Sequence, residues 1–442
     1  MRDSISSPGP IEEACYWLAT RPAQPGESLT GRIEADIAII GAGFTGLWTA
    51  HFLRQLEPKL KVVVLEQGVA GYGGSGRNAG IISVCLDHSH ELAAAHFGQE
   101  EADRLAQLGL QNIQELAAFA RNECDLELTG QLHVALTPSQ VDACRAMSYG
   151  RFLNAEETRA ELNSPLYLGA AFVCGGGTIN PVKLVDKLRR DLRLFEHSPV
   201  ISLEGNIART LAGEVRARKI VLATDAYSHH LFPKLLRYFI PLYDYILVSE
   251  PLTTEQQAAI GWRNRQGVTD GRTFFNYYRL TADNRVLWGT SEAKYYPRNR
   301  VDESCDHSEW HYRSLRESFA RHFPQLTGLE WEYAWGGPIA ATTRLTPFFG
   351  MKGDILYALG YTGHGIGSTR LAGKILAHMA LARPSELRNL SIVQRVPFPY
   401  PPEPIRSWAV KAVSAALRRV DAGEKPGLLL RVLETLGIGF SS

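Results

Sequence analysis

The strongest constraint on the fold lies in residues 36–67, with the sequence DIAIIGAGFTGLWTAHFLRQLEPKLKVVVLEQ. The apolar run 37–40 predicts a buried parallel strand, because such strands are covered on both faces. Apolar residues at helical spacing follow at 47–56, and the β-branched run 61–65 predicts a second strand. The segment therefore predicts one complete strand–helix–strand unit.

Three glycines in the GxGxxG spacing connect the first strand to the helix. Gly41 permits the tight turn, Gly43 lets the backbone approach a pyrophosphate, and Gly46 lets helix and strand pack closely. The free N–H groups at the start of the helix then point at the phosphates. Glu66 ends the second strand, where its carboxylate can bind both ribose hydroxyls and would repel a 2′-phosphate. The unit predicts a dinucleotide site that disfavours NADP.

Composition limits the other possibilities. The chain has 442 residues and a formal net charge of +1, so we expect two or more domains and no nucleic-acid partner. No apolar run is long enough to span a bilayer, and the first ten residues lack the apolar core of a secretory signal. Six scattered cysteines without a CxxC pair favour free thiols in the cytoplasm. The histidine pairs lack further ligands at regular spacing, so we expect no metal.

The remaining chain divides into regions of different character. Residues 235–300 are dense in aromatic and strand-forming residues, and Asp283-Asn284 predicts a hairpin turn among them. This region predicts a largely antiparallel sheet, distinct from the parallel nucleotide unit. Near the N-terminus, Tyr16 and Trp17 predict an arm that docks on the folded body. Residues 154–161 predict a helix that Asn154 caps.

The C-terminal tail predicts two short amphipathic helices, 405–420 and 428–436. Both carry basic residues beside apolar ones. They either pack on the body or on a sister subunit, or they bind a membrane or partner surface. A membrane role is the less favoured alternative, and the oligomeric state stays open.

Four glycine-containing or small-residue motifs stand in a fixed order along the chain. They are GAGFTG with Glu66, SGRNAG at 75–80, VLATDAYS at 221–228 and GYTGHG at 360–365. Together they resemble the D-amino-acid oxidase/glycine oxidase superfamily of FAD-dependent amine oxidoreductases, and are most like its gamma-glutamylputrescine-oxidase branch. The resemblance covers roughly residues 12–385.

The resemblance implies a mixed α/β fold, with an antiparallel-sheet substrate domain inserted into a Rossmann-like FAD-binding domain. The implied FAD-binding domain is discontinuous, and the substrate domain has two parts. The predicted boundaries are 1–30 for an N-terminal arm; 31–98, 150–234 and 336–395 for the FAD-binding domain; 99–149 and 235–335 for the substrate domain; and 396–442 for a C-terminal helical tail.

The resemblance also implies which residues hold FAD. The glycine-rich unit would hold the ADP half, the SGRNAG loop would lie beside the isoalloxazine or pyrophosphate, and the late glycine loop would wrap the pyrimidine end of the flavin. The helix after that loop points its positive end at the reduced flavin. Family members often have Asn where this chain has Asp225. The predicted set is Gly41, Gly43, Phe44, Thr45, Gly46, Glu66, Gln67, Ser75, Arg77, Asn78, Ala79, Gly80, Val200, Ala223, Thr224, Gly363, His364, Gly365, Ile366 and Gly367.

Four residues are the catalytic candidates. His364 could donate a hydrogen bond or a positive charge to the flavin, or be an ordinary loop histidine. Arg344 could bind a substrate carboxylate or phosphonate through two hydrogen bonds, or form a surface salt bridge. The other two are Arg77 and Tyr278. A wider set of pocket candidates is Tyr243, Tyr245, Tyr277, Arg279 and Trp335, and for each aromatic residue among them ordinary sheet packing is the favoured alternative.

The reaction implied by the resemblance is oxidation of a C–N bond by hydride transfer to flavin N5. We expect a small-molecule amine or amino acid as substrate, an imine product that water hydrolyses, and oxygen as the acceptor, giving hydrogen peroxide. Two alternatives remain. One is a dehydrogenase that passes electrons to a quinone or protein, which the basic tail would fit; the other is a non-catalytic FAD-holding subunit that binds a partner.

Overall fold

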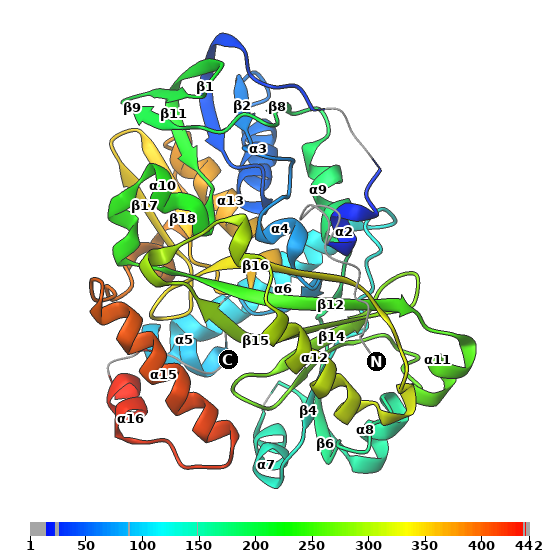
Figure 1. The fold of residues 1–442 in the computed structure, drawn as a ribbon. Coiled ribbons are helices and arrows are strands. Elements are labelled where there is room, and N and C mark those ends of the chain that lie inside the picture. The colour runs from blue at the N-terminus through cyan, green and yellow to red at the C-terminus, as the bar shows by residue number, and fades with distance from the viewer. Residues whose placement is uncertain (1–14, 23–25, 87–88, 148, 436–437, 439–442) are drawn as a thin grey trace.

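Two large sheets organise the computed structural model, which describes residues 15–22, 26–86, 89–147, 149–435 and 438 (Figure 1). The first sheet has the strand order β17-β18-β11-β1-β2-β8, and β10 and β9 extend it beside β11. The prediction about the first ten residues lies outside the described residues. The strands are β1 (Gly31–Ile40), β2 (Val62–Leu65), β8 (Arg193–Phe195), β9 (Ser202–Glu204), β10 (Ile207–Arg209), β11 (Gly213–Leu222), β17 (Phe348–Lys352) and β18 (Ile355–Leu359).

The predicted strand–helix–strand unit is present. β1 pairs in parallel with both β2 and β11, and α3 (Phe44–Leu56) begins directly after Gly43. α3 crosses α13 (Gly365–Ala380) closely, since a Cβ added to Gly373 would lie 2.6 Å from the Cβ of Trp48. These two helices and α6 (Gln99–Ala120) bury their apolar faces in one core with the sheet. That core fixes the start of both α3 and α13 relative to the strand ends.

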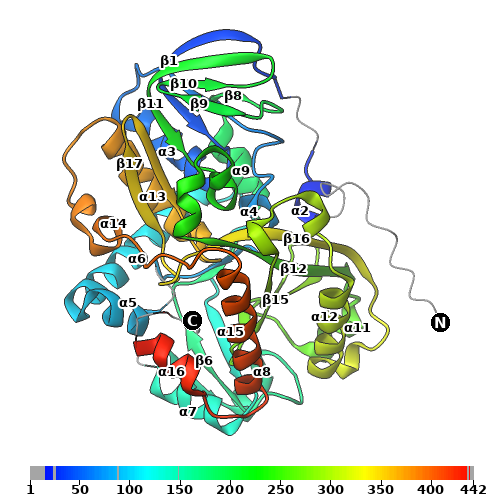
Figure 2. The ribbon, with the colours of Figure 1, turned by 60° about the vertical axis from the view of Figure 1, so that its left-hand side comes forward.

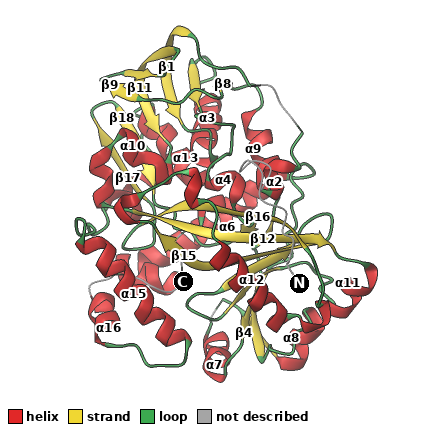
Figure 3. Cartoon of the chain, viewed as in Figure 1, coloured by secondary structure: helices red, strands yellow, loops and turns green. Residues whose placement is uncertain are grey.

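The second sheet has the order β16-β12-β15-β14-β13-β4-β6-β5 and is mostly antiparallel, as predicted for residues 235–300 (Figure 3). The predicted turn joins β14 to β15, and Asn284 takes the left-handed conformation there, with φ +63°. The strands are β4 (Gln131–Ala135), β5 (Arg151–Asn154), β6 (Gly169–Val173), β12 (Ile240–Pro251), β13 (Gly267–Asp270), β14 (Asn276–Leu280), β15 (Arg285–Tyr295) and β16 (Trp331–Ala341).

Further helices surround these sheets, and a short pair of strands, β3 (Ile81–Ile82) and β7 (Gly177–Thr178), forms a third sheet. The capping box at Asn154 starts α8, as the sequence predicts for a helix from that residue. The helices are α4 (Gly74–Arg77), α5 (His90–Phe97), α7 (Pro138–Ala146), α8 (Ala155–Glu161), α9 (Pro181–Arg189), α10 (Ser228–Leu231), α11 (Thr254–Ile260), α12 (Glu309–His322) and α14 (Ser391–Gln394).

Two segments lie on the other side of the predicted domain division. β5 and β6 extend the second sheet through β4, so residues 151–173 join the substrate side. α6 packs in the core of α3 and α13, so it joins the FAD side instead of the substrate side. An amphipathic pattern shows that one face of an element is buried, but it does not name the partner that covers it. The other boundaries stay a prediction.

The two ends of the described chain pack on the body. In α2 (Tyr16–Ala19), the indole Nε1 of Trp17 donates to the carbonyl of Asn78 at 2.8 Å, which docks the arm as predicted. The tail forms α15 (Ile405–Asp421) and α16 (Leu428–Thr435), which lie beside the second sheet (Figure 2). Within the described residues, we find no helix with the length and apolar character needed to cross a bilayer.

Candidate functional site

A cavity of about 1470 Å³ is lined by residues of both large sheets and of the C-terminal tail. Its first wall comes from the start of α3, the loop that contains α4, and the glycine loop before α13. Its second wall comes from β12, β13, β14 and β16, and its third from α15. A single space therefore connects the predicted dinucleotide site with the predicted substrate sheet.

The glycine unit has the geometry that its spacing predicts. Gly41 has φ +101°, and a Cβ there would lie 2.6 Å from the carbonyl oxygen of Ala223. A Cβ on Gly46 would overlap the carbonyl oxygen of Gly41, so neither position accepts a side chain. Gly43 faces the cavity, where a Cβ would lie 2.9 Å from the hydroxyl oxygen of Ser75. These positions keep the start of α3 open to the cavity.

Hydrogen bonds to Ser75 and Glu66 shape the same corner. The Ser75 hydroxyl accepts from the N–H of Phe44, the first residue of α3, at 2.8 Å. The Glu66 carboxylate accepts from the N–H groups of Ala42 at 2.8 Å and Gly68 at 3.0 Å. Burial raises the pKa of Glu66, and these backbone donors oppose that shift. The carboxylate is thus fixed at the end of β2, beside the glycine turn.

The loop from Ser75 to Gly80 is held by its own side chains and by Arg279. Asn78 donates from Nδ2 to the carbonyl of Ser75 and accepts from the N–H of Gly80, both at 2.8 Å. The buried Arg279 donates to the carbonyls of Gly80 and Ile179 at 2.9 and 2.7 Å. Burial lowers the pKa of Arg279 to about 10. Arg279 therefore holds the loop in place through these hydrogen bonds and does not line the cavity.

Arg77 lies in the cavity wall, but its guanidinium is committed to the neighbouring elements. Nη1 forms an ion pair with Asp306 at 3.1 Å and donates to the carbonyl of Gly336 at 3.1 Å. Nη2 donates to the hydroxyl of Tyr227 at 3.0 Å. The Arg77 side chain has no solvent exposure, and that of Asp306 is 4% exposed. This arginine joins the two sides of the molecule.

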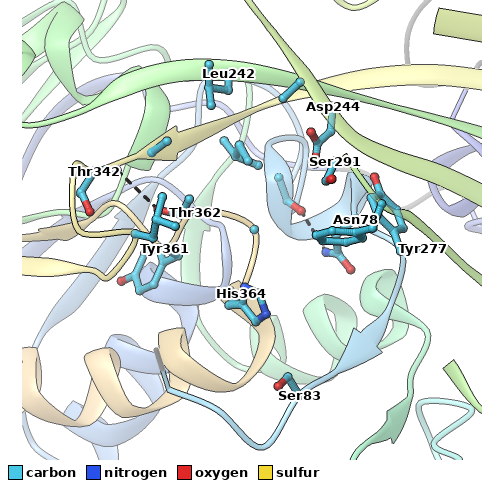
Figure 4. A pocket seen from close by; sticks show the side chains of 18 of the residues that line it. Asn78, Ser83, Leu242, Asp244, Tyr277, Ser291, Thr342, Tyr361, Thr362 and His364 are labelled. Carbon is cyan, nitrogen blue, oxygen red and sulfur yellow. Dashed lines mark hydrogen bonds between the residues drawn. The ribbon is translucent and has the colours of Figure 1, made fainter. Parts of the chain in front are cut away.

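Two half-buried histidines line the cavity. His364 is the N-cap of α13 and lines the cavity together with Gly365, Ile366 and Gly367 of the first turn of that helix (Figure 4). His133 lies on β4, and its Nδ1 is 2.8 Å from the hydroxyl of Thr269. Burial lowers the pKa of each ring to about 4, and for His133 the nearby His364 adds to the effect. Both rings are therefore neutral near neutral pH.

Two of the catalytic candidates do not face the cavity. Tyr278 is fully buried, and its ring stacks on Trp288 with centroids 4.2 Å apart, so it belongs to the core of the second sheet. Arg344 is 5% exposed and donates to the carbonyls of Arg395, Pro347 and Ile392 at 2.7, 2.8 and 3.0 Å. Arg344 therefore does not line the cavity, and among the described residues it forms no ion pair of the kind that the alternative expects.

The wider candidate sets divide in the same way. Tyr277 lines the cavity, whereas Tyr243, Tyr245 and Trp335 are buried behind it. Val200 packs on the core of the first sheet, away from the cavity. Most of the predicted FAD residues do line it: Gly43, Phe44, Thr45, Ser75, Arg77, Asn78, Ala79, Gly80, Ala223, Gly363, His364, Gly365, Ile366 and Gly367. Those that do not are Gly41, Gly46, Glu66, Gln67, Val200 and Thr224.

Asp225 lines the cavity and joins β16 to the segment that follows β18. Its carboxylate accepts from the N–H groups of Gly360 at 2.9 Å and Ala340 at 3.3 Å. Burial raises its pKa to about 6, against the effect of these backbone donors. The acid thus has a structural reason to stand here, whatever it contacts in the cavity.

Sequence reasoning missed the wall formed by the tail. Val410, Val413 and Leu417 of α15 line the cavity. The Asp421 carboxylate, at the end of α15, accepts from the N–H groups of Thr273 and Phe274 at 2.7 and 2.8 Å. No local pattern reveals such a contact, because it joins residues about 150 positions apart in the chain.

Comparison with known proteins now identifies the family. The family model described as FAD dependent oxidoreductase matches residues 36–379. The chain belongs to this family. It is 29% identical over 406 residues to gamma-glutamylputrescine oxidoreductase of Escherichia coli K12, which covers 87% of this chain and 92% of that protein.

Two solved structures show the same fold. Glycine oxidase from Geobacillus kaustophilus matches with a TM-score of 0.66 and 19% identity, over 82% of this chain and 100% of that one. Fructosyl amine: oxygen oxidoreductase (Amadoriase I) from Aspergillus fumigatus matches with a TM-score of 0.67 and 18% identity, over 84% and 91%. The predicted family and fold are therefore confirmed, and the enzyme is an FAD-dependent oxidoreductase.

Proposed function

We propose that this enzyme oxidises the C–N bond of an amine or amino-acid-like substrate to an imine, with oxygen as the final acceptor and hydrogen peroxide as its product. The supporting observation is the single cavity that reaches from the starts of α3 and α13 to the face of the second sheet. The names of the relatives, gamma-glutamylputrescine oxidoreductase, glycine oxidase and fructosyl amine oxidoreductase, all denote substrates with a C–N bond.

The residues of the first wall fit FAD. The open start of α3, with Gly43 beside Ser75, is the part of the structure suited to a pyrophosphate, because N–H groups and the helix dipole favour an anion there. Glu66, held by two backbone N–H groups at the end of β2, is suited to the adenosine ribose. The loop 363–367 would then hold the pyrimidine end of the flavin.

Bound FAD supplies the acceptor for a hydride that leaves the substrate carbon. The N-terminus of α13 stabilises negative charge in the cavity through its dipole. His364 contributes a neutral ring, because burial lowers its pKa to about 4. Leu242, Ile246 and the α15 residues exclude water around the reacting carbon. The chain's contribution is thus positioning and electrostatics, without an obligatory acid–base residue.

An oxygen electrode and a peroxide assay test this proposal. We expect an amine panel to bleach the flavin of the purified enzyme without oxygen, and to produce peroxide when air is admitted. An amine that bleaches the flavin without oxygen consumption would exclude oxygen as acceptor but keep amine oxidation. No bleaching by any amine or amino acid would overturn the proposal.

A dehydrogenase is the second candidate, because apolar side chains are exposed on the tail. Trp408 on α15 is 66% exposed and Leu428 on α16 is 79% exposed. Because α15 also lines the cavity, these exposed apolar residues could receive a quinone or protein acceptor close to the flavin site. This candidate predicts that reduced enzyme reacts with a soluble quinone much faster than with oxygen, and that removing residues 404–442 abolishes the difference.

A further inference from the structure

Asp244 occupies an irregular position in the second sheet. On β12 it lies between Tyr243, which pairs with Lys294, and Tyr245, which pairs with Thr290, so three residues of β15 lie opposite this single residue. Such a bulge redirects side chains at functional sites. Asp244 lines the cavity together with Leu242 and Ile246 of the same strand face, and with Ser291 and Tyr277 beside it (Figure 4).

The carboxylate of Asp244 lacks the partners that other buried acids of this structure have. Its Oδ1 is buried and makes no hydrogen bond with any described residue. Asp225 and Asp270, which also line the cavity, accept from backbone N–H groups, and Asp270 further pairs with Arg272 at 2.7 Å. A buried polar atom without a partner is costly, so its persistence in a cavity points to a ligand.

Among the described residues around Asp244, no cation is left to pair with it, because Arg77 is paired with Asp306. Three strands surround Asp244. β14 contributes the ring of Tyr277, and β16 contributes Gly337, against which the side chain of Arg77 lies. β15 carries the charged residues Glu292 and Lys294. Glu292 pairs with Arg418, and the Lys294 ammonium lies over the ring of Tyr296. Burial alone accordingly raises the pKa of Asp244 to about 7.

The cations that line the cavity are engaged elsewhere or stand at its exposed edge. Among the described lining residues, Arg77 pairs with Asp306 and Arg272 with Asp270. Arg406 is buried and donates to the carbonyl of Pro401, while Arg237 is exposed. A substrate carboxylate beside the reacting carbon needs a positively charged partner in such an apolar space. The cavity offers the opposite charge.

We propose that Asp244 binds an ammonium group of the substrate, and that the enzyme selects cationic amines whose reacting carbon carries no carboxylate. Where the bound ammonium is the reacting group, its proton passes to solvent before the hydride leaves, because only the neutral amine can form the imine. This inference rests on the proposed amine oxidation, because it names the class of amine. The apolar walls at Leu242, Ile246 and Ile339 receive the hydrocarbon part of such a molecule. The bulge of β15 leaves the carboxylate free to meet the cation.

Three small molecules of one shape test the charge preference of the holoenzyme. tert-Butylammonium has no hydrogen on the carbon that carries nitrogen, so it cannot be oxidised; pivalate and tert-butanol are its anionic and neutral counterparts. Isothermal titration calorimetry measures their binding without any turnover. We expect the cation to bind about ten- to a hundredfold more tightly than pivalate.

Asp244→Asn keeps the shape of the side chain and removes its charge. We expect it to lose the preference for the cation, and to lose the fall in cation affinity below about pH 7 that protonation of the wild-type carboxylate causes. Ser291→Ala, which alters the neighbouring wall without removing a charge, should keep both. Equal binding of the cation by wild type and Asp244→Asn, or tighter binding of pivalate by wild type, would overturn the inference.

The two proposals can fail separately. If amines bleach the flavin while Asp244→Asn binds the cation as well as wild type does, amine oxidation stands and the role of Asp244 is wrong. If the cation binds through Asp244 while no amine bleaches the flavin, the proposed reaction is wrong and the cation site stands. Oxidation of amino acids in strong preference to their decarboxylated amines would also refute the substrate class.

Discussion

Removal of Arg77 tests whether this arginine joins the two sides of the enzyme. Arg77→Met keeps the apolar stem of the side chain but removes the ion pair with Asp306 and the hydrogen bonds to Gly336 and Tyr227. It leaves a carboxylate that is 4% exposed without its cation. Breaking such a buried pair from one side costs about 3–5 kcal/mol.

That cost converts into a measurable shift in the melting temperature. A folded chain of 442 residues has an unfolding entropy of about 0.9 kcal/mol/K near its midpoint, if it unfolds as one unit. The expected fall in Tm is therefore about 3–5 °C. Circular dichroism and flavin fluorescence on the holoenzyme measure it together. If Arg77 acted only in catalysis, activity would fall while Tm stayed unchanged.

Two comparisons decide the cause of the shift. Arg77→Met/Asp306→Asn removes the stranded charge, so it should regain part of the lost Tm. Lys183→Met breaks an exposed pair with Asp125, which should cost less than about 1 kcal/mol. The fall in Tm caused by Arg77→Met should also shrink below about pH 6. Burial raises the pKa of Asp306 to about 6, although Arg77 opposes that shift. Below this pH Asp306 of the wild type is protonated, so no ion pair is left for the substitution to remove. A Tm equal to wild type, or a double variant no more stable than Arg77→Met, would refute the reasoning.

Four further substitutions have specific expected outcomes. Gly46→Ala should lower the flavin content of purified protein, since its Cβ would overlap the Gly41 carbonyl; full flavin occupancy would contradict the close helix–strand crossing. Asp421→Ala should release the end of α15 and raise KM more than it lowers kcat, whereas an unchanged KM would show that this end does not restrict the cavity. Arg344→Met should lower Tm but leave the charge preference of substrates intact, because its donors are taken up by backbone carbonyls. Asp244→Asn should raise Tm more at about pH 8 than at about pH 5: burial raises the folded pKa of Asp244 to about 7, so wild type loses stability progressively as pH rises from the unfolded value of about 4 to about 7, and an equal gain in Tm at both pH values would refute this.

The features that the sequence predicted well have short-range causes. The strand–helix–strand unit, the cap at Asn154 and the hairpin turn at Asn284 each depend on residues within one segment. Their physical reasons, backbone freedom at glycine, a side chain that accepts free N–H groups, and a left-handed turn residue, act locally. The family motifs extended this success to the fold, because they fix which segments come together.

The features that the sequence did not predict depend on contacts between distant segments. His133 of β4 and the apolar face of α15 reach the cavity only because β4 pairs with β13 and the end of α15 binds the loop after β13. The alternation of apolar and polar residues within one strand does not show which other strands pair with it. The misplaced β5, β6 and α6 have the same cause.

Most of the remaining errors concern which face of a strand a side chain occupies, because successive side chains point to opposite faces of the sheet. Sequence reasoning chose Tyr243 and Tyr245 on β12 because aromatic residues suit a substrate pocket. The pleat directs both into the core and turns Asp244, the residue between them, toward the cavity. On β14 it turns Tyr277 toward the cavity and buries Tyr278.

Because neighbouring residues point in opposite directions, the charge of the site is the reverse of the charge that the sequence predicted. Arg344 follows Thr343 and precedes Leu345, which both line the cavity, yet its own guanidinium turns away to bind carbonyls. With that cation withdrawn and Asp244 turned inward, the charge that a substrate meets changes from positive to negative. A guanidinium would have selected an anionic group beside the reacting carbon, whereas a carboxylate in an apolar wall selects an ammonium. Side-chain direction, more than residue composition, therefore sets the class of molecule that this enzyme can take.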